Sequence, residues 1–72
     1  MTRKNDPLEE MAEQAAYMGL MVNSPGAIEA IKTVLETGGT PRDVLRMFEK
    51  KNGKGFLADT FYYAAKYIRR TG

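Results

Sequence analysis

The residues of this chain that could do chemistry are mostly cations, because side chains suited to proton transfer or nucleophilic attack are scarce. The 72 residues include 11 Lys and Arg and 9 Asp and Glu, but no histidine and no cysteine. Their absence removes the commonest metal ligands, the usual general base near neutral pH and the thiol nucleophile. Ser24, the only serine, has no histidine to activate it. We therefore predict a non-enzymatic protein with no catalytic residue, no metal and no cofactor.

The cations are concentrated in the second half of the chain. Residues 1–37 hold three cations and six acids, a net charge of −3, whereas residues 38–72 hold eight cations and three acids, a net charge of +5. A concentrated basic patch raises the local potential far more than the overall charge of +2 suggests. This asymmetry predicts a polyanionic partner, which is either nucleic acid, with DNA favoured over RNA, or an acidic protein.

Three prolines mark where the elements that position these cations begin. Each follows a residue whose side-chain oxygen can cap a helix, and proline suits the first helical turn because the amide it lacks would be unpaired there. The pairs are Asp6-Pro7, Ser24-Pro25 and Thr40-Pro41. Glu9 follows Asp6 by three residues and Asp43 follows Thr40 by three, which is the spacing of a capping box.

Helical periodicity extends these starts into four helices. The predicted ranges are 7–22, 25–37, 41–51 and 56–70. Gly38-Gly39 ends the second helix and residues 52–55 break the third. We therefore predict an all-α compact bundle of four short helices in a single domain, residues 1–72, with frayed ends at 1–5 and 71–72. No apolar run approaches the roughly 20 residues that span a bilayer, so we expect a cytoplasmic protein without a membrane partner.

The first predicted helix is apolar almost all round. Its main stripe has helical spacing and is predicted to face the core. The stripe consists of Leu8, Met11, Ala12, Ala15, Met18, Gly19 and Val22. Tyr17, Leu20 and Met21 fall off this stripe, and they need burial by the later helices or by another copy of the chain. We expect a homodimer whose interface contains Tyr17, Leu20 and Met21.

The fourth predicted helix carries tyrosines and cations on the side opposite its apolar line. Such a face can pair with phosphates and contact sugars or unpaired bases; the alternative is a solvated helix end with cations near the negative end of its dipole. The basic turn before this helix would attract anions or simply connect two helices. The predicted nucleic-acid-binding residues are Arg42, Arg46, Lys50, Lys51, Lys54, Tyr62, Tyr63, Lys66, Arg69 and Arg70.

Residues 28–48 contain a helix ending in Gly-Gly and a second helix capped by Thr-Pro. This stretch resembles the first two helices of trihelical helix-turn-helix domains of transposases and small phage or bacterial regulators. The resemblance covers residues 27–70 and implies that Phe56–Arg70 is the recognition helix. Leu45 stands where the family usually has a small residue, and the turn at residues 50–55 is longer than the family's tight turn.

Together these features predict a small nucleic-acid-binding regulator or accessory factor that uses its basic C-terminal half. The alternative is a protein-protein adaptor or inhibitor of the kind that phages and plasmids encode. It would dock on a host protein through the same basic and tyrosine face or through the apolar end of the first helix. Salt dependence separates the two, since neutralising phosphates makes affinity fall steeply as salt rises.

Overall fold

Four helices account for most of residues 7–71, the part of the chain that this computed structural model describes. They are α1 (Pro7–Asn23), α2 (Pro25–Glu36), α3 (Pro41–Asn52) and α4 (Phe56–Thr71), and no strand occurs among them. The all-α prediction is confirmed, and every predicted helix begins at its predicted residue. Thr71 continues α4 and does not fray as predicted; the predicted ends at 1–5 and 72 lie outside the described residues.

The predicted capping box at the start of α3 is confirmed. The Asp43 backbone N–H donates to Thr40 Oγ1 at 3.2 Å, and the Thr40 backbone N–H donates to Asp43 Oδ2 at 2.9 Å. The prediction for Ser24 is wrong, because its side chain makes no capping hydrogen bond. Instead the Ser24 carbonyl accepts the backbone N–H of Ala27 at 2.9 Å. The predicted cap at Asp6 lies outside the described residues.

The capping box makes the stability of α3 decrease in acid. Hydrogen bonds from the Thr40 backbone and side chain, with Arg46 nearby, hold the pKa of Asp43 below its ordinary value of 3.8. A lowered pKa stabilises the fold above the unfolded-state pKa, and that stabilisation is lost as pH falls through the folded-state pKa. We expect the stability difference between wild type and Asp43→Asn, followed by urea unfolding, to shrink below pH 3.8. A difference that stays constant down to the lowest pH would contradict this.

Two glycines end α2 for different reasons. Gly38 has φ +97°, a left-handed conformation that side-chain-bearing residues rarely adopt. Gly39 lies so close to α2 that a Cβ there would be 2.6 Å from Val34 Cγ1 and 2.8 Å from the Val34 carbonyl oxygen. The predicted Gly-Gly terminator is therefore confirmed, and it brings the chain back toward the start of α3.

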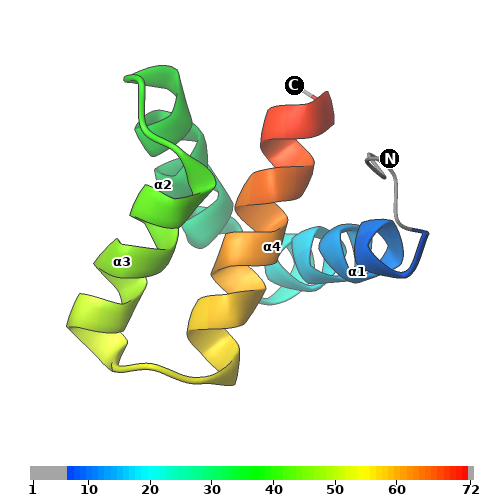
Figure 1. Cartoon of the computed structure of the whole chain (residues 1–72), viewed down its shortest axis with the longest axis horizontal. Helices are drawn as coiled ribbons and strands as arrows, with labels where there is room; N and C mark the ends of the chain where they lie inside the picture. Colours follow the sequence, from blue (N-terminus) through cyan, green and yellow to red (C-terminus); the bar gives the residue numbers. More distant parts are fainter. Residues whose placement is uncertain (1–6, 72) are drawn as a thin grey trace, which may run out of the picture.

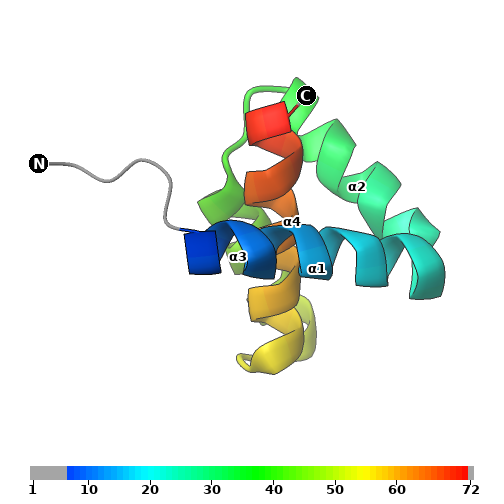
Figure 2. The ribbon, with the colours of Figure 1, turned by 90° about the vertical axis from the view of Figure 1, so that its right-hand side faces the viewer.

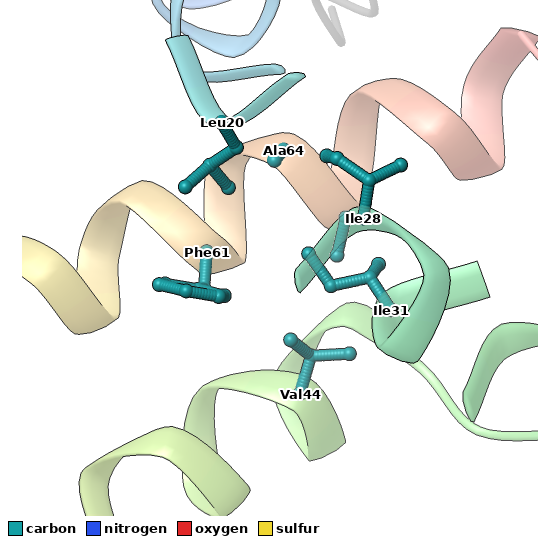
Figure 3. Packing of buried hydrophobic residues seen from close by; sticks show 7 residues of the cluster. Leu20, Ile28, Ile31, Val44, Phe61 and Ala64 are labelled. Atoms are coloured by element: carbon teal, nitrogen blue, oxygen red, sulfur yellow. The ribbon is translucent and has the colours of Figure 1, made fainter. Parts of the chain in front are cut away.

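Helix α4 lies in the middle of the molecule, between α1 on one side and α2 and α3 on the other (Figure 1). Figure 2 shows α1 lying across α4. Ala64 and Ala65 on α4 are fully buried, and such small side chains let neighbouring helices approach closely. The core side chains of all four helices converge around them (Figure 3); the labelled ones are Leu20, Ile28, Ile31, Val44, Phe61 and Ala64.

The face that α1 turns inward is not the predicted one. All seven residues of the predicted core stripe are exposed, with Leu8 at 76% and Val22 at 80%. The buried face instead carries Glu13 and Leu20, with Tyr17 half-buried and its ring 4.9 Å from that of Tyr67. The physical reason is that this face offers both a large apolar side chain for the core and carboxylates that pair with α4.

This orientation also corrects the predicted dimer interface. Leu20 is 5% exposed and belongs to the core of the single chain, and Tyr17 packs against that core. Leu20 is therefore not available to a second copy as predicted, Tyr17 is only partly accessible, and Met21 remains exposed. Within residues 7–71, no helix has the length and apolar character needed to cross a membrane.

Candidate functional site

The fold divides the predicted nucleic-acid-binding residues into two main groups. The first group lines a groove between the beginnings of α1 and α3 and the second half of α4, and it contains Arg42, Tyr62, Lys66, Arg69 and Arg70. The second group lines a hollow at the end of α3, and it contains Arg46, Lys50 and Lys54. Tyr63 lines a separate groove between α1 and α4, and Lys51 lies between α2 and α3. The cations therefore do not form the single patch that was predicted.

The groove of the first group is also lined by three glutamates, Glu9, Glu10 and Glu13. The Lys66 ammonium donates a hydrogen bond to Glu9 and lies 3.6 Å from Glu13 Oε2. Arg70 Nη2 donates to Glu13 Oε1 at 2.6 Å. Two of the α4 cations are therefore neutralised by carboxylates of α1, and a phosphate would have to displace those carboxylates.

These ion pairs favour the charged forms of both cations. The hydrogen bond to Glu9 raises the pKa of Lys66 above its ordinary 10.5, against the opposing effect of burial. The hydrogen bond to Glu13 likewise raises the pKa of Arg70. A raised pKa stabilises the fold below the unfolded-state value, and this stabilisation is lost as pH rises through the folded-state pKa. Lys66 and Arg70 thus stay charged across the neutral range, and loss of their protons weakens the link between α1 and α4 in alkali.

The α4 tyrosines are also engaged within the fold. Tyr62 and Tyr63 are half-buried, and their ring centroids are 5.7 Å apart. The Lys66 ammonium lies 5.3 Å from the centroid of Tyr62 and 5.8 Å from that of Tyr63, within cation–π range. Since α1 lies across α4 (Figure 2), the side of α4 that carries Lys66 and Arg70 faces α1. This is the side of α4 whose tyrosines and cations were predicted to contact nucleic acid.

The cations of α3 form no ion pair within residues 7–71, although Arg42 also lines the glutamate-containing groove. Arg42, Arg46 and Lys50 follow one another at four-residue intervals, which on a helix places them in one line about 6 Å apart. They lie opposite the side that buries Val44. Lys54 continues the series in the turn after α3. We call these four residues the α3 cation row.

Every member of the α3 cation row is exposed, and none has a carboxylate oxygen within 4 Å in residues 7–71. Like charges four residues apart destabilise a helix by roughly 0.2–0.5 kcal/mol per pair. Asp43 and Glu49 flank the row and offset part of this repulsion. The row therefore presents an exposed line of positive charge, and its repulsion lowers the stability of helix α3.

The pairing partners on α1 were missed from the sequence, although a signal for them was present. Glu9 and Glu13 are four residues apart, and so are Lys66 and Arg70. Two helices with opposite charges at the same spacing can pair when they pack side by side. The sequence does not show that α1 and α4 are the helices that pack, and this pairing across 57 positions is visible only in the structure.

Comparisons with protein-family models, with curated proteins and with solved structures found no match for this chain. The structure itself defines a small all-α domain of four helices, with one face of cations neutralised and another face of cations exposed.

Proposed function

We propose that this domain is a non-enzymatic nucleic-acid-binding regulator or accessory factor that contacts phosphates through the α3 cation row. The observation that carries the proposal is the contrast between the two groups of cations. Lys66 and Arg70 are paired with α1, whereas the row on α3 is exposed and has no ion pair within the described residues. The proposal therefore keeps the predicted phosphate contacts of α3 and Lys54 and leaves out the predicted contacts of α4.

The spacing of the α3 cation row supports a polyanion as its ligand. A line of cations about 6 Å apart can contact successive charges of an extended anion, whereas a small anion would engage only one or two of them. Such contacts to phosphate hold the backbone and carry no sequence information directly. We therefore propose binding with little base readout, and with DNA favoured over RNA.

A fluorescence titration with a short DNA duplex over a series of salt concentrations tests this proposal. Each phosphate contact contributes a slope of about −0.9 to the dependence of log affinity on log salt. We expect Arg46→Ala and Lys50→Ala each to weaken binding and to reduce the slope by about 1. Both residues are exposed, so we expect circular dichroism to show unchanged helicity.

Arg69→Ala is the matched control, because Arg69 is an exposed cation on α4 outside the α3 cation row. It removes the same charge, and we expect it to leave the affinity nearly unchanged. Equal losses for Arg69→Ala and Arg46→Ala would show that the contact surface is not confined to the α3 cation row. Absence of duplex and single-strand binding by the wild type at low salt would refute a nucleic-acid ligand.

The second candidate function is a protein-protein adaptor or inhibitor. The observation that favours it is the exposed apolar surface of α1, together with Phe56 at 86% exposure at the start of α4. Contiguous apolar surface of this kind marks sites of protein contact. An acidic protein could use the α3 cation row in the same way as a nucleic acid, and the duplex titration distinguishes the two.

A further inference from the structure

The outward side of α1 has the pattern of a helix-pairing seam. Exposed apolar residues follow one another along it at intervals of three and four, which is the spacing of a heptad repeat. We call these residues, Leu8, Met11, Ala15, Met18 and Val22, the α1 seam. All are exposed in the single chain, including Met18 at 56%.

The positions beside the α1 seam carry no charge. In paired helices these flanking positions choose the partner through their charges. Here they are Ala12, Gln14, Gly19 and Met21. Like charges that would repel a second copy are therefore absent from the flanks. Opposite charges that would select a different protein are absent as well.

Gly19 provides independent evidence for a close approach. A glycine in the interior of a helix is destabilising relative to alanine. No contact within residues 7–71 requires it, since a Cβ at Gly19 would meet none of their atoms within 4 Å. A glycine at this place is explained if the backbone of another helix lies against it.

An apolar groove lies next to the α1 seam, on the side of α1 that carries small residues. It runs between α1 and the start of α4, and Ala12, Ala15 and Gly19 line it together with the exposed Phe56 and Leu57. A helix seated on the seam would therefore also contact α4. This larger area matters because a specific interface buries about 800 Å² on each partner, more than one short helix face supplies.

We propose that the α1 seam binds the α1 seam of a second copy, with the two helices antiparallel and the two-fold axis near Ala15. This arrangement places Leu8 against Val22 of the second copy and Met11 against Met18 of the second copy. The small flanking residues also meet, since Ala12 lies beside Gly19 of the second copy.

Two features favour this occupant and this orientation. The seam is self-complementary about Ala15, so the same surface of both copies can pack together, as an isologous contact requires. The antiparallel orientation also separates the acidic first turns, which carry Glu9 and Glu10. A parallel pair would bring these turns together. The seam is distinct from the α3 cation row, so the dimer does not depend on nucleic-acid binding.

Analytical ultracentrifugation of the wild type and two glycine variants tests the dimer. We expect a concentration-dependent species of twice the 8.1 kDa chain mass. Gly19→Leu should abolish this species, because the new side chain blocks the approach, while its Cβ meets no atom within 4 Å in the described residues of the single chain. Gly26→Leu is the matched control on α2, where a Cβ likewise meets nothing within 4 Å, and it should dimerise like the wild type. Circular dichroism checks that both variants remain helical.

The lack of native cysteine permits a second, direct test. Ala15→Cys should form a disulfide-linked dimer under mild oxidation far faster than Thr33→Cys, an exposed control on α2. In an equimolar mixture, Leu8→Cys and Val22→Cys should crosslink mainly to each other, as the antiparallel arrangement requires. A wild type that stays at 8.1 kDa at all concentrations would overturn the dimer. Crosslinking of Leu8→Cys mainly to itself would overturn the antiparallel arrangement.

Discussion

Glu13→Ala is expected to loosen α1 from α4 and to lower the free energy of unfolding by about 1–3 kcal/mol. Glu13 is 4% exposed and accepts a hydrogen bond from Arg70 at 2.6 Å, with Lys66 3.6 Å away. Its removal leaves Arg70 without its hydrogen-bonded carboxylate and opens space between the helices. The loss stays below that of a fully buried pair, because both cations are partly exposed and water can solvate them.

Thermal unfolding checks this expectation, since each kcal/mol shifts Tm by roughly 4–8 °C in a domain of this size. Glu29→Ala is the control: Glu29 is an exposed glutamate on α2 without an ion pair in residues 7–71, and changes of this kind stay within about 0.5 kcal/mol. Glu13→Gln, which keeps the size but not the charge, should fall between the two. Equal Tm values for Glu13→Ala and Glu29→Ala would show that the pairing between α1 and α4 contributes nothing.

Leu20→Ala is expected to have the larger effect, a loss of about 2–5 kcal/mol. Leu20 is 5% exposed and joins α1 to the core that α2, α3 and α4 build (Figure 3). A domain of this length has a total stability of only roughly 4–11 kcal/mol at the usual value per residue. We therefore expect a sizeable unfolded fraction of Leu20→Ala at 37 °C, measured as lost helicity and a lowered urea midpoint.

Met18→Ala is the control that makes this result diagnostic of the orientation of α1. Met18 belongs to the stripe that periodicity predicts to be core, yet it is 56% exposed. In dilute solution, where pairing of two copies does not contribute, we expect its truncation to cost less than about 1 kcal/mol. A larger loss for Met18→Ala than for Leu20→Ala would mean that the predicted stripe is the buried face after all.

The amino-acid sequence by itself determined where the helices of this protein begin and end. Prolines at the first helical positions mark the starts of α2 and α3, Thr40 caps α3, and the glycines at 38 and 39 end α2. These signals are local, because a cap or a left-handed glycine acts within one turn of the chain. The uneven distribution of charge is also evident without a structure, because it follows from counting the charged residues in each half of the chain.

Only the tertiary structure decided which side of α1 is buried and which cations remain exposed. Since α1 is apolar almost all round, its periodicity allowed either face to turn inward. The choice was made by groups on α4, where Tyr67 packs on Tyr17, and Lys66 and Arg70 pair with glutamates 57 positions away. Burial and ion pairing depend on distances between helices, which helical periodicity along the chain does not contain. The same contacts neutralised Lys66 and Arg70 of α4 and left the cations of α3 exposed.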